Sequence, residues 1–156
     1  MKRIRKIHFG TEDTTIIYDE NVGENLWQKT SIDSPEMPKR EFENAMQELA
    51  QDVVKICELN MVDLDVLTIT GLTLIYGKNP ANFVVMITSK KPVQLSNSPR
   101  NIASPKIELG VISEDDSAHD YKMNLKEKIN LILNYAENYI NGDRVKIQPE
   151  SANLFE

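Results

Sequence analysis

The sequence predicts an α+β fold in which a mostly antiparallel sheet is covered on one face by two helices. Residues 38–57 and 124–140 place apolar side chains at three- and four-residue spacing, which is typical of amphipathic helices. Short β-prone runs separated by turn-rich segments lie elsewhere. We therefore expect three strands, a helix, two strands, a long arm and a second helix. The sheet has five strands, or six if residues 107–112 add another.

The first thirty residues predict a three-stranded meander. Its strands are residues 4–9, 14–18 and 26–30, and turn-forming residues separate them. Trp27 is expected to serve as a core anchor, on the sheet face that it shares with Lys29.

The first helix is expected to begin at Pro38, because proline fits the first turn of a helix. One stripe of its surface is apolar: Phe42, Ala45, Met46, Leu49, Val53, Ile56 and Cys57. The opposite side is polar and acidic: Glu41, Glu43, Glu48, Gln51 and Asp52. We expect the apolar stripe to lie against the sheet and the acidic side to face solvent.

Two apolar strands, residues 64–76 and 83–88, are expected to follow as an antiparallel hairpin because the connection between them is short. Gly71, in the middle of the first strand, indicates a bulge or a bend.

Residues 90–122 predict a long arm, since prolines interrupt this segment and no long periodic element appears. An arm of this length in a small domain is typical of a functional arm, a lid or an insert. Asn124 is the expected N-cap of the last helix, with Glu127 completing a capping box. We find no internal repeat, and the chain divides into one domain, residues 1–142, and a tail, residues 143–156.

Composition and charge indicate an ordinary soluble domain of 156 residues that carries a net charge of −6. No apolar run is long enough to span a membrane, and the basic N-terminus lacks the apolar segment of a secretory signal. The single cysteine, Cys57, cannot form an internal disulfide, which favours a reducing cytoplasm. Its expected role is that of a small buried apolar side chain.

Basic residues near the N-terminus and in the middle of the chain form a candidate nucleic-acid site. The candidate residues are Lys2, Arg3, Arg5, Lys6, Lys90 and Lys91. They would need to gather on one face beside Trp27 or a tyrosine to bind a single strand. The acidic net charge disfavours this role, and alternating charges on one strand more often indicate a solvated edge strand.

Patterns that carry catalysis or bind cofactors are lacking in the sequence. It holds no glycine-rich phosphate loop, no set of zinc ligands and no nucleophilic triad. The densest group of metal-binding side chains is Glu114, Asp115, Asp116, His119 and Asp120. Carboxylates adjacent in sequence usually diverge into solvent, so an exposed acidic loop is the favoured interpretation. We therefore predict no catalytic residue, no metal site and no cofactor.

The C-terminal tail offers candidate partner-binding residues, Leu154 and Phe155. Bacterial sliding clamps capture short peptides of the form Gln-Leu-x-Leu-Phe, and residues 151–155 resemble that pattern only at these two positions. Docking of the tail onto this protein or onto a second copy remains the alternative.

The middle and the end of the chain resemble a family of small phage and prophage proteins. The similar segments are residues 54–59, 67–72, 85–88, 95–99 and 136–142, with the tail ending in Leu154 and Phe155. The resemblance covers most of residues 40–156. It implies a place among phage early, replication or recombination genes, and it brings no catalytic residues because the family has no established activity.

These observations favour a non-enzymatic, phage-encoded accessory protein that binds a macromolecular partner in the bacterial cytoplasm. A replication, recombination or host-defence protein is the expected partner, and a homo-oligomer remains open. The alternative is a single-stranded nucleic-acid-binding component of a recombination module, and a metal-dependent hydrolase is less favoured. Residues 31–62, with a local charge of −4, also permit an inhibitor of host defence that mimics nucleic acid.

Overall fold

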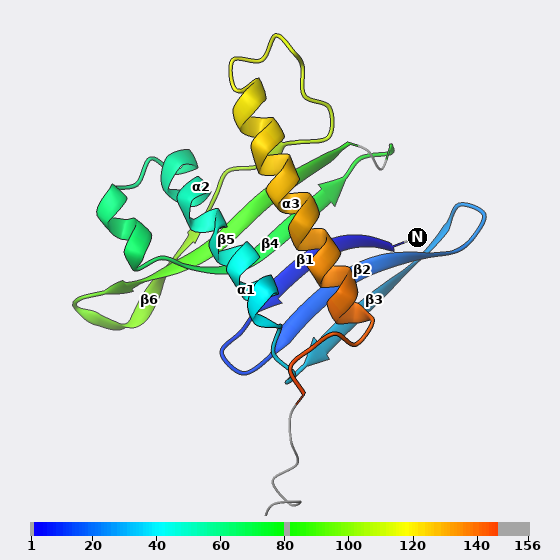
Figure 1. Cartoon of the computed structure of the whole chain (residues 1–156), viewed down its shortest axis with the longest axis horizontal. Helices are drawn as coiled ribbons and strands as arrows, with labels where there is room; N and C mark the ends of the chain where they lie inside the picture. The colour runs from blue at the N-terminus through cyan, green and yellow to red at the C-terminus, as the bar shows by residue number, and fades with distance from the viewer. Residues whose placement is uncertain (1, 80–81, 147–156) are drawn as a thin grey trace, which may run out of the picture.

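The computed structural model describes residues 2–79 and 82–146 (Figure 1). It confirms the α+β class, with seven strands in these ranges rather than five or six. The strands are β1 (Lys2–Phe9), β2 (Thr14–Gly23), β3 (Leu26–Ser34), β4 (Thr68–Tyr76), β5 (Phe83–Val93), β6 (Ser96–Ala103) and β7 (Ile107–Glu108). The helices are α1 (Arg40–Gln47), α2 (Leu49–Ile56), the 3₁₀ helix η1 (Met61–Asp65) and α3 (His119–Ile140).

The sheet is antiparallel throughout and has the order β3-β2-β1-β4-β5-β6. The short strand β7 pairs with the beginning of β5, at Val84 and Val85. Two three-stranded meanders meet where β1 pairs with β4, with Ile7 opposite Leu72. Each meander is followed by helix, so the arrangement of three strands and a helical segment occurs twice. This duplication of topology has no counterpart in a sequence repeat.

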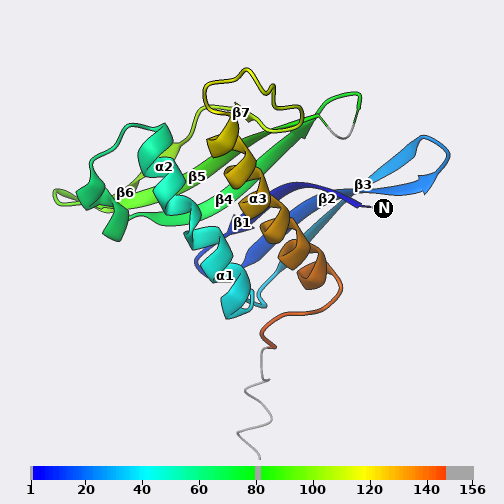
Figure 2. The same ribbon diagram turned by 45° about the horizontal axis from the view of Figure 1, so that its top comes forward.

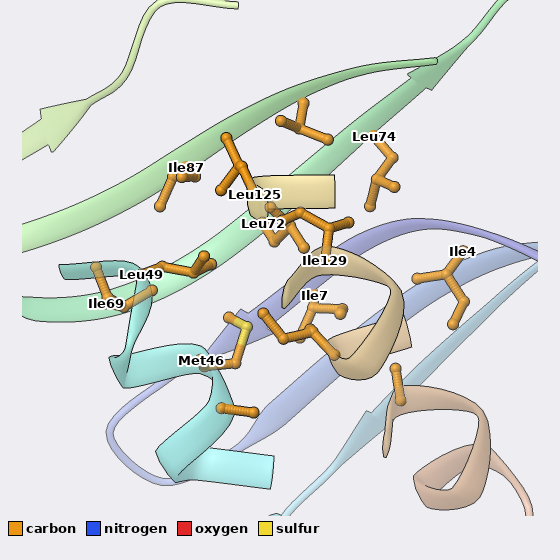
Figure 3. Packing of buried hydrophobic residues seen from close by; sticks show 14 of the residues in the cluster. Ile4, Ile7, Met46, Leu49, Ile69, Leu72, Leu74, Ile87, Leu125 and Ile129 are labelled. Atoms are coloured by element: carbon orange, nitrogen blue, oxygen red, sulfur yellow. The ribbon is translucent and has the colours of Figure 1, made fainter. Parts of the chain in front are cut away.

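All three α-helices lie on one face of the sheet (Figures 1 and 2). Beneath them the core forms rows across the strands, such as Ile16, Ile7, Leu72 and Ile87, which are all 0% exposed. Figure 3 shows Met46 of α1, Leu49 of α2, and Leu125 and Ile129 of α3 meeting this layer. Burial of these apolar faces is the main stabilising contribution to the fold.

The first part of the expected arm, residues 90–103, is mostly strand. β5 continues to Val93 and turns directly into β6, so residues 90–103 form a hairpin. Its prolines are tolerated for local reasons: Pro92 lies at a register shift between Lys91 and Val93, and Pro99 lies on the edge strand β6. No sequence pattern predicts this hairpin, because both of its faces reach solvent and the usual alternation of apolar and polar residues is missing.

Both predicted helices differ in their bounds. The first is divided at Glu48 into α1 and α2. The last begins at His119, so Asn124 lies inside α3 and is not its N-cap. Asp116 explains the earlier start, because its carboxylate accepts hydrogen bonds from the Ala118 amide, at 2.9 Å, and from Lys122, at 2.6 Å.

Candidate functional site

A surface hollow lies between η1 and the turn that joins β5 to β6, two segments found at the left of Figure 1. We call it the tip groove. It has a volume of about 660 Å³. The residues that line it are Asp63, Val66, Lys91, Pro92, Val93, Gln94, Leu95 and Arg100.

Local sequence builds the groove from two short elements. Residues 94 and 95 form the two-residue turn between β5 and β6, which projects Leu95 from the end of the hairpin. On the other side, η1 is closed by the Asp63 amide, which donates to the Asn60 carbonyl at 2.9 Å, and Val66 follows this turn. The groove is thus held between a tight hairpin end and a single helical turn.

The walls of the tip groove are apolar and exposed. Leu95 is 99% exposed, Val66 is 47% exposed and Val93 is 39% exposed. Met61 and Val62, the first two residues of η1, are also more than 70% exposed. Single exposed apolar residues are ordinary, whereas several that gather around one hollow are typical of an interaction surface.

Two basic side chains at the groove have different partners. Lys91 donates to the Asp63 carboxylate at 3.0 Å, which fastens η1 to β5 and neutralises both charges. Arg100 lies opposite Lys91 in the β5–β6 register and is exposed. Within the described ranges no carboxylate forms an ion pair with Arg100. The groove therefore presents one cation that is free to bind an anion.

The predicted nucleic-acid residues are only partly brought together. Arg3 lies over the Trp27 ring, with its guanidinium carbon 3.8 Å from the ring centroid. The Asp19 carboxylate oxygens lie 3.7 Å from guanidinium nitrogens of Arg3 and of Arg5, so Asp19 partly neutralises both side chains. Trp27 and Lys29 share the sheet face opposite the helices, because each pairs with a residue of β2 that points away from the core. Trp27 is therefore not the core anchor that the sequence predicted.

The remaining basic candidates lie apart from that cluster. Lys2 donates to the Asn141 side chain at 3.3 Å and so turns toward α3. Lys91 belongs to the tip groove, and Lys90 pairs with Thr68 on β4. Lys6 alone joins the Arg3 side as an exposed cation, opposite Ile17 in the β1–β2 register. The six residues do not form one basic surface.

A buried carboxylate joins the helices α2 and α3. Asp52 is 4% exposed and accepts hydrogen bonds from the Tyr121 hydroxyl, at 2.7 Å, and from Lys128, at 3.1 Å. Burial and the bond to Asp52 raise the pKa of Tyr121 well above its usual value. The sequence analysis placed Asp52 on the solvent side, which is wrong. Its spacing of three residues from Leu49 and four from Ile56 was the signal of burial.

The acidic side chains before α3 and in its first turn do not converge on one point. Glu114, Asp115 and Asp120 are exposed, and Asp116 pairs with Lys122. In the part of the chain that the structure describes, no three His, Cys, Asp or Glu side chains come together as metal ligands. Cys57 is partly buried, and burial raises the pKa of its thiol.

The candidate residues Leu154 and Phe155 lie outside the described residues. None of the described helices has the length and apolar character needed to cross a membrane. No protein-family model matches the chain, and no curated protein or solved structure shows significant similarity to it.

Proposed function

We propose that this chain is a non-enzymatic, phage-encoded accessory protein that binds a macromolecular partner in the bacterial cytoplasm. A replication, recombination or host-defence protein of the host or of the phage is the partner class. The observation that carries the proposal is the tip groove, in which Val66, Val93 and Leu95 surround a hollow beside the unpaired Arg100. The phage context comes from the resemblance of the sequence alone.

The groove suits recognition of a peptide segment of another protein. Its exposed apolar side chains gain free energy when a partner removes them from water. Arg100 adds orientation, because a guanidinium pairs with a carboxylate through two parallel hydrogen bonds. Interfaces of this kind are typically driven by a few large side chains near the centre and rimmed by charge.

Three carboxylates that are not exposed have structural partners, which supports binding rather than catalysis. Asp52 joins two helices, Asp116 fixes the start of α3, and Asp63 anchors η1. Each of these carboxylates is engaged by a neighbouring side chain or amide. The exposed apolar side chains of the groove and Arg100 can bind a partner without these three carboxylates.

Capture experiments with matched variants test this proposal. We expect tagged wild-type chain to enrich a specific protein from lysates of infected and uninfected bacteria. Leu95→Ser should abolish that enrichment, because Leu95 is the most exposed apolar side chain of the groove. Leu131→Ser is the matched control, since Leu131 is a leucine on α3, 47% exposed and outside the groove. Equal recoveries with both variants, or no enriched protein, would refute the proposal.

The tail is a second candidate contact, with a bacterial sliding clamp as the first partner to test. A variant with Leu154→Ser and Phe155→Ser should lose clamp binding while Leu95→Ser retains it. Clamp binding that survives the loss of both tail residues would exclude this contact.

Single-stranded nucleic-acid binding is the alternative function, and one observation favours it. Trp27 lies beside Arg3, and the exposed Lys6 shares their side of the sheet. Because Trp27 is the only tryptophan, its fluorescence reports directly on base stacking. A signal that oligonucleotides do not change at low salt would rule this function out.

A further inference from the structure

We propose that the tip groove of one copy of this chain binds the C-terminal segment of a second copy, with Leu154 and Phe155 against Val66, Val93 and Leu95, and Glu156 at Arg100. The inference rests on the proposed function, because it assigns an occupant to the same binding surface. The C-terminal segment would also regulate that surface, because a bound segment competes with any other partner.

The chemistry of the groove selects a specific kind of segment. Its walls supply apolar contact area, and its one unpaired charge is positive. The neighbouring Asp63 is already neutralised by Lys91, so the groove offers no free anion to attract a basic peptide. A complementary segment therefore carries large apolar side chains next to a carboxylate.

The end of this chain has that pattern. Leu154 and Phe155 are adjacent large apolar residues, and Glu156 follows them directly. In an extended segment, neighbouring side chains point to opposite sides and lie a few ångströms apart. One apolar side chain can then enter the groove while the other covers Leu95, and the carboxylate reaches its rim.

The place where the described chain ends favours a second copy over the same copy. The Val145 amide donates to the Met37 carbonyl at 2.9 Å, which places this point just before α1. From there α1 and α2 together extend for about 25 Å, and η1, which contributes Asp63 to the groove, follows α2 along the chain. Eight fully extended residues from Lys146 to Leu154 span only about 26–29 Å. A tail in the same copy would reach the groove only at the limit of its length.

Binding between copies has a consequence for assembly. If two copies exchange tails, each groove is filled and the assembly closes as a dimer. The fraction of free grooves then depends on protein concentration. A partner protein would have to compete with the tail for the same apolar walls.

A labelled synthetic peptide of residues 147–156 tests recognition directly. It is titrated into full-length chain that carries Leu154→Ser and Phe155→Ser, so that the chain's own tail cannot compete, and fluorescence anisotropy reports binding. We expect saturable binding that Leu95→Ser or Arg100→Glu weakens at least about tenfold and that Leu131→Ser leaves unchanged. A peptide with Glu156→Lys should bind the Arg100→Glu chain better than the wild-type peptide does, because the charge pair is restored.

Absence of saturable binding, or equal binding to the Leu95→Ser chain, would overturn the proposal. All substituted groove positions are exposed, and circular dichroism confirms that the variants keep their fold. The second copy is tested by light scattering of the full-length chain across a concentration series. We expect a dimer that the tail or Leu95→Ser substitutions convert to a monomer, whereas a monomer well above the peptide's dissociation constant would overturn the assignment to a second copy. These readouts use purified protein, so a failed lysate capture leaves them unaffected.

Discussion

At the scale of single residues, Gly71 is fixed by the close approach of three strands. A Cβ atom at this position would lie 2.7 Å from the Thr88 hydroxyl oxygen and 2.8 Å from the Ile7 carbonyl oxygen. Both distances are shorter than real contacts of a Cβ atom, and the Ile7 oxygen belongs to the backbone and cannot turn aside. Gly71 is also where the β4–β5 register shifts, so the sequence-based expectation of a bulge is confirmed.

Substitution of Gly71 by alanine should therefore destabilise the fold. We expect Gly71→Ala to lower the free energy of unfolding by about 1–3 kcal/mol, because the strands must separate to accommodate the methyl group. Gly23→Ala is the control, since its nearest contact would be an ordinary 3.7 Å to the Leu26 Cβ, and it should change stability by less than about 0.5 kcal/mol. Urea unfolding measures both variants. Equal stabilities would show that the strands can yield at Gly71.

The sequence correctly predicted which side chains share a face of the sheet where the pattern followed the two-residue period of a strand. Trp27 and Lys29 do share a face of the sheet, as expected for positions two residues apart. Asp52 was predicted on the solvent side because it is acidic, although its spacing matches the buried stripe. The compensating partners, Tyr121 and Lys128, are about seventy residues away along the chain, so no local pattern could reveal that a buried carboxylate would be satisfied there.

At the scale of elements, helix periodicity predicted which segments are helical and missed where they begin. The start of α3 depends on Asp116, whose carboxylate binds the Ala118 amide and the Lys122 ammonium. Its hydrogen bond with Lys122 and then that with the Ala118 amide hold the pKa of Asp116 below its ordinary value. The charged form of Asp116 is thus the form that organises the first turn, where the helix dipole also favours negative charge.

Loss of that carboxylate should loosen the first turn of α3. We expect Asp116→Ala to increase hydrogen exchange of the amides in residues 119–123, with little change toward the end of the helix. The carboxylate of Asp115 makes no ion pair within the described ranges, so Asp115→Ala is the control. Because the pKa of Asp116 is lowered in the folded state, its carboxylate stabilises the first turn fully above about pH 4. This stabilisation is lost as the pH falls below that value. Exchange in Asp116→Ala that matches the wild type would contradict this role.

At the scale of the whole molecule, the two meander-and-helix units are interleaved. The helices of the first unit contact strands of the second, since α1 touches β4 and α2 touches β4 and β5. The helix of the second unit, α3, in turn contacts β1 of the first unit. The pairing of β1 with β4 makes the sheet continuous across the boundary. Sequence patterns predicted one layer of helices on one sheet but could not predict this exchange, which depends on strand order.

Interleaving predicts that the chain unfolds as one cooperative unit. Leu72→Ala, on the boundary strand β4 and 0% exposed, should lower the free energy of unfolding by about 2–5 kcal/mol. Ile75→Ala is the matched control, because Ile75 lies on the same strand, is 45% exposed and should cost less than about 1 kcal/mol. The pair tests directly whether only one face of the sheet supports the core.

Two probes report on the two units during the same denaturant titration. Trp27 fluorescence follows β3, at the outer edge of the first unit, whereas far-ultraviolet circular dichroism is dominated by the helices, the longest of which, α3, belongs to the second unit. We expect the two transitions to coincide in the wild type and to shift together in Leu72→Ala, because the helices of each unit cover strands of the other unit. Separate transitions would mean that each meander keeps its own core. The exchange of helices between the units would then contribute little to stability.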